Sequence, residues 1–300
     1  MEYIQEANMD VSCIDSIEQL EKAYHEGTIL CSRALIYDKN TGLHFNLGGY
    51  KAVMPCAEII YTPGDNTVKE AAIVTRINKK VCFVITHIEQ SEGVTTVYIS
   101  RRRLQQKIYE EYISRLKPGD VIPCCITHVD SFGVFCDIGG GITALLPIDF
   151  ISVSRIGSTQ DRFYTGQNIY GCIKSIDKNG RIVLTHKELL GTWQQNADLF
   201  TAQTTVTGIV RSVESYGIFV ELTPNLAGLA EVCEGIKTGD VVDVFIKSIL
   251  PDKMKIKLII MNKSTDKPDT SELKYFISEG HIDRWQYSTD RSKKYIVTDF

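Results

Sequence analysis

Two aromatic pairs occupy matching places in the chain. Phe132 and Phe135 are separated by a glycine and a valine. At a distance of 84 positions, Tyr216 and Phe219 are separated by a glycine and an isoleucine. An exposed aromatic ring is a platform on which an unpaired base stacks, a contact worth about 1 to 3 kcal/mol per base. The pairs therefore predict the binding of single-stranded nucleic acid.

The alternation of residues predicts which way the second ring of each pair faces. Successive side chains of a strand point to opposite faces, so Phe135 shares a face with Asp137 and Phe219 shares a face with Glu221. A face that carries a carboxylate is expected to point to solvent, which predicts that both phenylalanines point outward. The alternative is that the rings are core residues of a barrel, and the sequence leaves it open.

Each aromatic pair is followed, later in its repeat, by a basic residue at the head of a strand. Arg181 precedes the alternating apolar residues Ile182 and Leu184, and Lys255 stands at the equivalent place in the next repeat. Alternation places both cations outside, together with Lys257. We expect Arg181 and Lys255 to contact the phosphates of a bound strand.

These residues belong to an internal repeat. Residues 121–146 align with residues 205–230 without a gap, and a weaker copy begins at residue 42. The weaker copy carries Thr41, His44 and Thr96 where the second copy carries its two rings and its arginine. The predicted domains are 1–116 (an N-terminal helix, a degenerate repeat and a connecting helix), 117–200 (a repeat and the following helix), 201–263 (a repeat) and 264–300 (a tail).

Short helices are expected between the repeats. Ser16 and Gln19 have the spacing of a capping box, and Gly27 is placed to end the helix that follows them. Apolar stripes at fourfold spacing predict two connecting helices, one through Leu104, Ile108 and Tyr112 and one through Leu189, Trp193 and Ala197. In the first copy, the apolar runs Ala71–Val74 and Val81–Ile85 are expected to be strands.

Composition argues against several classes of protein. The 300 residues carry a formal net charge of −4, which disfavours indiscriminate binding to duplex DNA. The 9 cysteines are odd in number and form no Cys-x-x-Cys motif, so we expect reduced core residues in a cytoplasmic protein. No apolar run approaches the length of a membrane span, and the acidic start is unlike a signal peptide.

The sequence offers no motif of an active site. The histidines are not spaced as metal ligands, and Gly139-Gly140-Gly141 lacks the lysine of a phosphate loop, so a hairpin turn is expected there. Arg101-Arg102-Arg103 is interpreted either as a phosphate contact or as a solvated helix face. We therefore predict no catalytic residues, no metal, no cofactor, no small-molecule substrate and no membrane partner.

The chain resembles the S1 RNA-binding domain family, the repeat of bacterial ribosomal protein S1. Besides the aromatic pair, the resemblance rests on Gly119-Asp120-Val121, Ala144-Leu145-Leu146-Pro147, Gly166-Gln167-Asn168-Ile169 and Ile176-Asp177-x-x-Gly180-Arg181-Ile182-Val183-Leu184-Thr185. It implies a mainly β fold of three tandem five-stranded OB-fold barrels joined by short helices. The RNA-facing residues that it implies are Phe132, Phe135, Asp177 and Arg181 in the second copy, and Tyr216, Phe219 and Lys255 in the third.

The chain departs from the family pattern at one position of the second copy and at two positions of the third. The family histidine falls on Pro147 and on Glu231, and in the third copy the family aspartate falls on Pro251, one residue before Asp252. One expected contact per domain is thereby put in doubt.

Three functions fit a chain that resembles this family. The first is a protein of the small ribosomal subunit that holds single-stranded mRNA and attaches to the subunit through residues 1–116. The second is a regulatory RNA-binding protein that is not stably bound to the ribosome. The third is an accessory subunit of an RNA-degrading enzyme.

Overall fold

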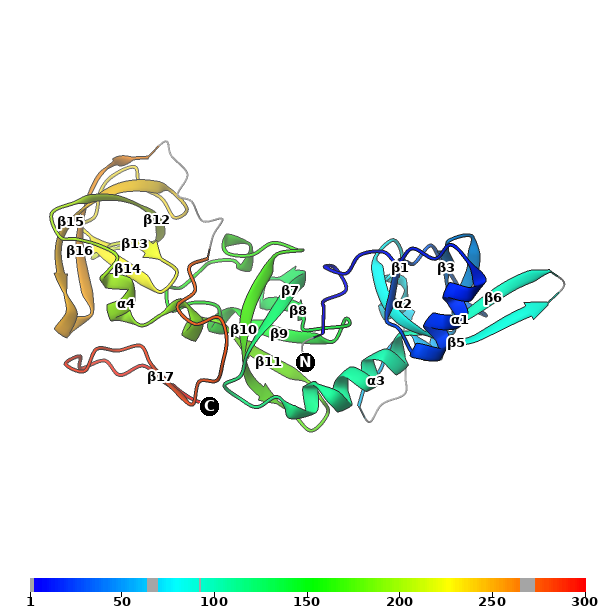
Figure 1. The fold of residues 1–300 in the computed structure, drawn as a ribbon. Coiled ribbons are helices and arrows are strands. Elements are labelled where there is room, and N and C mark those ends of the chain that lie inside the picture. Colours follow the sequence, from blue (N-terminus) through cyan, green and yellow to red (C-terminus); the bar gives the residue numbers. More distant parts are fainter. Residues whose placement is uncertain (1–2, 64–69, 92, 265–272) are drawn as a thin grey trace. The chain divides into compact units, whose positions relative to one another are not determined.

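The fold is mainly β, as predicted. The computed structural model describes residues 3–63, 70–91, 93–264 and 273–300 (Figure 1). The beginning of the expected tail, residues 265–272, lies outside the described residues. The chain forms two compact units. The first contains residues 1–116, 136–144 and 176–182, and the second contains the remainder.

The first repeat folds into a six-stranded sheet in the order β1-β5-β6-β4-β3-β2. Its strands are β1 (Leu30–Arg33), β2 (Ile36–Asp38), β3 (Gly42–Leu47), β4 (Tyr50–Met54), β5 (Lys80–Ser91) and β6 (Val94–Ser100). β1 pairs with β5, and β2 pairs with β3, at the two ends of this order. Ala34 and Leu35 separate β1 from β2. β1 and β2 therefore correspond to the two halves of the first strand of a barrel. With β1 and β2 counted as one strand, the strand order is the same as in the two closed barrels of the second and third repeats.

The helix α1 (Ile17–Glu26) begins and ends where the sequence predicts. Ser16 is its N-cap, with a side chain that accepts a hydrogen bond from the backbone N–H of Gln19. Gly27 takes the left-handed conformation at its C-terminus, with φ of 62°. The strand expected at Ala71–Val74 was wrong, because these residues belong to the helix α2 (Glu70–Val74). A short apolar run does not by itself distinguish the two structures.

The second and third repeats are closed five-stranded barrels (Figure 1). The second consists of β7 (Val121–Asp130), β8 (Gly133–Asp137), β9 (Thr143–Pro147), β10 (Asn168–Ile176) and β11 (Ile182–Thr185). The third consists of β12 (Thr205–Glu214), β13 (Gly217–Thr223), β14 (Leu226–Ala230), β15 (Val241–Leu250) and β16 (Lys255–Lys263). A parallel pair, β14 with β16, closes the third barrel. The predicted OB-type architecture is confirmed for these copies.

Connecting segments fold as short helices. α3 (Arg101–Glu111) follows the first sheet, and α4 (Trp193–Ala197) precedes the third barrel. The 3₁₀ turns are η1 (Cys56–Glu58), η2 (Ile113–Arg115), η3 (Ile148–Phe150), η4 (Thr159–Asp161), η5 (Lys187–Leu190) and η6 (Pro251–Lys253). Gly191, with φ of 83°, separates η5 from α4, so the stripe through Leu189 and Trp193 is two short turns and not one helix.

The C-terminal tail packs inside the second unit. It contains a two-stranded sheet of β17 (Arg284–Gln286) and β18 (Val297–Asp299). Trp285 and Tyr287 are buried in the same apolar cluster as the core of the third barrel. The hydroxyl of Tyr287 donates a hydrogen bond to the backbone oxygen of Asn225, which follows β13. The tail is therefore a structural part of this unit.

Candidate nucleic-acid interface

The aromatic pair of the third barrel lies at the turn between β12 and β13. Tyr216 is 68% exposed and Phe219 is half-buried. Their ring centroids are 6.2 Å apart and the ring planes meet at 87°, an edge-to-face arrangement. A side chain at Gly217 would place its Cβ 2.7 Å from the backbone oxygen of Ala230. The glycine between the rings thus allows β13 to lie close to β14.

Register places one lysine in line with this pair. Phe219 pairs with Leu229 on β14, and Leu229 pairs with Lys257 on β16. Directly paired residues project from the same face of a sheet, so Lys257 lies in the same outer row as Phe219. Lys255, the predicted phosphate contact, is exposed two residues earlier on the same face. The alternation of β16 indicated that Lys257 faces outward, but only the parallel register shows that it is in line with the ring.

The second barrel carries the same pair with a third ring. Phe132 is 50% exposed, and its centroid lies 6.0 Å from that of the half-buried Phe135 at 85°. The imidazole of His128 stacks on Phe135 at 6.2 Å and 26°. Sequence reasoning did not identify His128 as a site residue. In the alignment of the repeats, His128 corresponds to Ser212, which pairs with Phe219 in the third barrel. This correspondence is the signal that could have identified His128 as a neighbour of Phe135.

Asp177 and Arg181 form a tight turn between β10 and β11. One carboxylate oxygen of Asp177, Oδ1, accepts hydrogen bonds from the backbone N–H groups of Asn179 and Arg181, each at 2.8 Å. Asp177 is therefore used in holding the turn. Arg181 is exposed, and its guanidinium makes no ion pair within the described part of the chain.

The carboxylates that share a face with the phenylalanines are buried, contrary to expectation. Glu221 is 5% exposed and accepts two hydrogen bonds from Arg162 and two from Arg211, at 2.9 to 3.1 Å. Asp137 is 2% exposed. The inference that a carboxylate marks a solvated face was wrong, because hydrogen bonds from arginines or from backbone N–H groups allow a carboxylate to be buried. The partial exposure of Phe135 and Phe219 is a separate observation and does not depend on it.

Asp137 is held by backbone groups and lies near a buried ion pair. It accepts hydrogen bonds from the N–H groups of Glu6, Gly139 and Gly141 at 2.7 to 3.0 Å. Burial and then the neighbouring Glu6 carboxylate raise the pKa of Asp137 to about 6. Arg101 is only 1% exposed, and its Nε lies 2.6 Å from a carboxylate oxygen of Glu6. Neither interpretation of Arg101 as a phosphate contact or a solvated residue was therefore right.

The first repeat has no ring pair at the corresponding place. His44 Nε2 lies 2.7 Å from the hydroxyl of Thr41, which also donates to Asp38. His44 pairs across the sheet with Ile36, a residue that is 64% exposed. This surface presents an aliphatic side chain and a hydrogen-bonded imidazole where the other copies present edge-to-face ring pairs.

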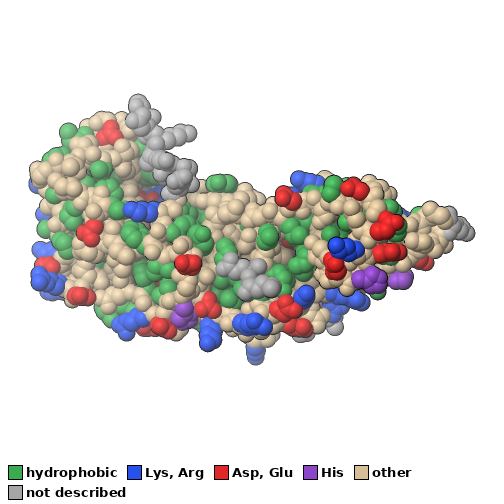
Figure 2. Space-filling model, viewed as in Figure 1, with side chains coloured by type: hydrophobic (Ala, Val, Ile, Leu, Met, Phe, Trp, Pro, Cys, Tyr) green, Lys and Arg blue, Asp and Glu red, His purple; other side chains and the backbone are tan. Residues whose placement is uncertain are grey.

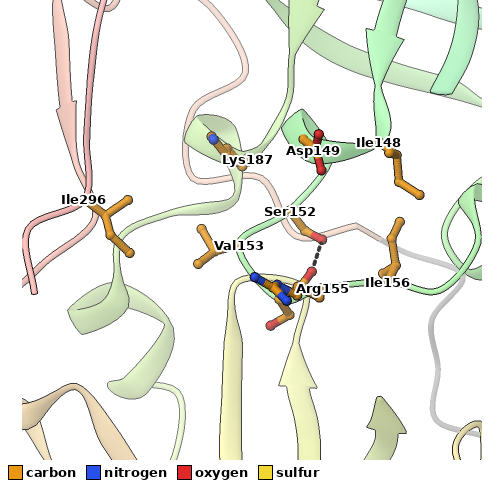
Figure 3. Close-up of a pocket in the computed structure, with 9 residues that line it drawn as sticks. Ile148, Asp149, Ser152, Val153, Arg155, Ile156, Lys187 and Ile296 are labelled. Carbon is orange, nitrogen blue, oxygen red and sulfur yellow. Dashed lines mark hydrogen bonds between the residues drawn. The ribbon is translucent and has the colours of Figure 1, made fainter. Parts of the chain in front are cut away.

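A cavity of about 520 Å³ adjoins the aromatic pair of the third barrel. Its lining includes Tyr216 and Phe219 from the barrel, Arg155 from the loop after η3, and Lys294 from the tail. A second cavity of about 440 Å³ shares the loop residues Val153 to Arg155 and extends to Lys187 (Figure 3). The lining of the first of these cavities combines aromatic rings with cationic side chains.

The described residues form no candidate metal site, and one face of the molecule carries mixed charges. Within the described ranges, no three His, Cys, Asp or Glu residues are placed to hold a metal ion. None of the described helices is long and apolar enough to cross a membrane. On the face drawn in Figure 2, Lys and Arg are interspersed with Asp and Glu.

Comparison with known proteins confirms the resemblance. Residues 115–187 match the S1 RNA binding domain family. Small ribosomal subunit protein bS1 of Leuconostoc lactis is 30% identical over 175 residues, which cover 54% of this chain and 40% of that protein. The bS1 protein of Rhodopseudomonas palustris is 27% identical over 73% of this chain and 38% of its own length.

One further relative and one solved structure align with more of the chain. A 4-hydroxy-3-methylbut-2-enyl diphosphate reductase of Fusobacterium nucleatum is 25% identical over 92% of this chain and 34% of its own length. A crystal structure of a multidomain protein with nucleic acid binding domains from Streptococcus pneumoniae aligns with 80% of this chain and 75% of its own, at a TM-score of 0.27 and 14% identity. The chain spans less than half the length of the three curated relatives.

Proposed function

We propose that this chain, which resembles bacterial small ribosomal subunit protein bS1, binds single-stranded RNA by stacking bases on the ring pairs of its second and third barrels. In this proposal it acts in translation in the cytoplasm, with mRNA as the bound strand, and has no catalytic activity of its own. The proposal further assigns attachment to the small ribosomal subunit to residues 1–116.

The observation that carries the proposal is the recurrence of one surface arrangement. An exposed ring stands edge-to-face with a half-buried ring at the same repeat position of two barrels. An exposed ring makes few contacts that would stabilise the fold, and splayed bases of a single strand can reach it. Bases inside an A-form duplex cannot reach it. The match of residues 115–187 to an RNA-binding domain family supports RNA as the nucleic acid.

The test is a titration with a labelled single strand of RNA and with the same sequence as a duplex. We expect the full chain to prefer the single strand. Replacing Phe135 and Phe219 together by alanine should weaken binding by about 2 to 6 kcal/mol if two stacking contacts are lost additively. Tyr164→Ala is the matched control, because Tyr164 is 64% exposed and makes no ring contact with either pair.

Thermal unfolding must be recorded beside the titration, since both phenylalanines are half-buried. Unchanged affinity of the double variant, with a lower melting temperature, would show that the rings serve the fold and not RNA. Equal affinity of the wild-type chain for duplex and single strand would also contradict the proposal.

The second candidate function is that of a regulatory RNA-binding protein that does not stay on the ribosome. It shares the ring pairs and differs only in the partner of the first repeat. A sucrose gradient separates the two candidates, because only the first predicts co-sedimentation with small subunits at moderate salt.

A further inference from the structure

Three cationic side chains line the cavity beside the third barrel, namely Arg155, Arg211 and Lys294. The charge of Arg211 is already neutralised by carboxylates. The guanidinium of Arg211 donates two hydrogen bonds to Glu221 and lies 3.7 Å from Asp161. Arg155 and Lys294 are exposed, and the side chain of neither makes a hydrogen bond or ion pair with the described residues. These two side chains are therefore available to an anionic ligand.

Arg155 and Lys294 reach the cavity from two segments outside the third barrel. Arg155 follows η3, in a loop that is tied to the third barrel by a backbone hydrogen bond from the N–H of Ser154 to the oxygen of Pro224. The hydroxyl of Ser152 donates to the backbone oxygen of Ser154 at 2.8 Å and braces the same loop (Figure 3). Lys294 follows Ser292, whose hydroxyl accepts a hydrogen bond from the Lys294 N–H.

The cavity also joins the cations to the stacking groups. Tyr216 and Phe219 line the same space as Arg155 and Lys294. Glu214 is the one carboxylate among the described residues that line it. The adjoining cavity continues from Arg155 to Lys187, with Asp149 as the only carboxylate among its described lining residues (Figure 3). A flexible strand of RNA combines flat bases with one phosphate per nucleotide, and this lining offers groups for both.

We propose that the loop 152–156 and the C-terminal tail extend the RNA site of the third barrel, with Arg155 and Lys294 contacting phosphates next to the base that stacks on Tyr216 and Phe219. This inference rests on the proposed function, because it names further contacts of the same bound strand. It assigns a ligand contact to the tail, which packs on the third barrel.

The test measures the affinity of the full chain for a labelled single-stranded RNA of 12 nucleotides at several salt concentrations. Arg155→Ala and Lys294→Ala should each reduce the slope of log affinity against log salt by about 0.7. That change corresponds to a loss of about fivefold at 0.1 M salt relative to 1 M. Lys293→Ala is the matched control, because Lys293 is exposed, adjacent to Lys294 and absent from the cavity lining. Glu214→Gln should strengthen binding, since it removes the carboxylate from the same space.

The outcomes separate this inference from the proposed function. If the ring variants Tyr216→Ala and Phe219→Ala weaken binding but Arg155→Ala and Lys294→Ala behave like Lys293→Ala, the extended site is refuted and the stacking function stands. If the wild-type chain binds no single-stranded RNA, both fail. If Lys293→Ala alters the slope as much as Lys294→Ala, the effect is one of overall charge and the extended site is refuted as well.

Discussion

The side chains that surround the ring pairs differ between the two barrels. In the second barrel the phenylalanine Phe135 carries a stacked imidazole, His128, whereas in the third barrel Phe219 has Ser212 opposite and Lys257 in its row. The same ring can thus be flanked by an aromatic neighbour or by a cation. We therefore expect the second barrel to contribute more to base stacking and the third barrel to contribute more to phosphate contacts.

We predict that the lysines of β16 contact the phosphates of a bound RNA strand. Lys255→Ala and Lys257→Ala should each lower the salt slope of RNA affinity by about 0.7 and weaken all RNA sequences alike, because each removes an exposed cation from the strand face that carries Lys257 in line with Phe219. Lys263→Ala is the control, since that lysine is ion-paired with Asp240 at 2.8 Å. A changed base preference with an unaltered slope would show that the lysines face bases.

Arg181 allows the same measurement in the second barrel. Arg181→Ala should reduce the salt slope to the same extent, because its guanidinium is exposed and makes no ion pair with the described residues. Asp177→Ala should act differently. Its carboxylate holds the turn through two backbone N–H groups. The loss of the carboxylate should therefore lower the free energy of unfolding and leave the salt slope of RNA affinity unchanged.

At the scale of elements, buried polar networks position the segments around the third barrel. Glu221 on β13 holds Arg162, which follows η4, and Arg211 on β12. The side-chain oxygen of Asn225 accepts a hydrogen bond from the N–H of Val153, and its amide nitrogen donates to the backbone oxygens of Lys187 and Gly191. These bonds order the loop that carries Arg155.

Removing the carboxylate of Glu221 should therefore be costly. Glu221→Ala leaves two largely buried guanidinium groups without their partner, and breaking a buried pair in this way costs about 3 to 5 kcal/mol. Urea unfolding followed by tryptophan fluorescence reports on this unit alone, because both tryptophans, Trp193 and Trp285, lie in it. Glu231→Ala, at an exposed position, should leave the midpoint unchanged. A midpoint as high as that of wild type would refute the anchoring role of Glu221.

The docking of the tail should depend on pH through His186. Its Nδ1–H donates to the backbone oxygen of Ile151 and its Nε2 accepts from the hydroxyl of Tyr275, each at 2.9 Å, so the neutral ring satisfies both. Burial lowers the pKa of His186 to about 4 from 6.5. The unfolded chain then binds the proton more readily between pH 6.5 and 4, and the stability present above pH 6.5 is lost as pH falls through this window, by about 3 kcal/mol in total.

Unfolding of His186→Gln by urea at pH 7 and at pH 4.5 checks this expectation. The variant should be less stable at pH 7 and should lose less stability on acidification than the wild-type chain. His128→Gln, at an exposed imidazole, should retain the wild-type pH dependence. Equal pH dependence of His186→Gln and wild type would mean that other groups cause the loss.

At the scale of the whole molecule, the first repeat differs from the others at the surface that carries rings elsewhere. Ile36, which pairs with His44, is 64% exposed, and the preceding Leu35 is 49% exposed. We predict that Ile36→Glu in the full chain abolishes co-sedimentation with small ribosomal subunits and leaves the affinity for single-stranded RNA unchanged. Val94→Glu, at a position that is 58% exposed, is the matched control.

Point variants suit this test better than a cut after Leu116. Residues 136–144 belong to the same compact unit as residues 1–116, and the Asp137 carboxylate accepts a hydrogen bond from the Glu6 N–H. A fragment that ends at Leu116 would therefore lack a hydrogen-bond partner of Glu6. Loss of RNA binding in Ile36→Glu, or unchanged co-sedimentation, would contradict the division of roles.

The features predicted correctly are those that depend on neighbours in the sequence. The N-cap Ser16 and the left-handed Gly27 delimit α1, because capping involves residues within one turn. The buried Ile256 and Leu258 alternate with exposed lysines, because alternation is a property of the strand itself. The repeat also indicated the ring pairs, since equal spacing in equal strands places both at the same turn.

Only the tertiary structure decided which charged groups are buried. Asp137 and Glu221 lie on the strand face that the sequence assigns to solvent, but their partners Glu6 and Arg162 are 131 and 59 positions away along the chain. The same holds for Lys257, whose place beside Phe219 depends on the register of a parallel pair. Burial of a charge is set by groups that pack against it, and no local pattern records which distant groups those are.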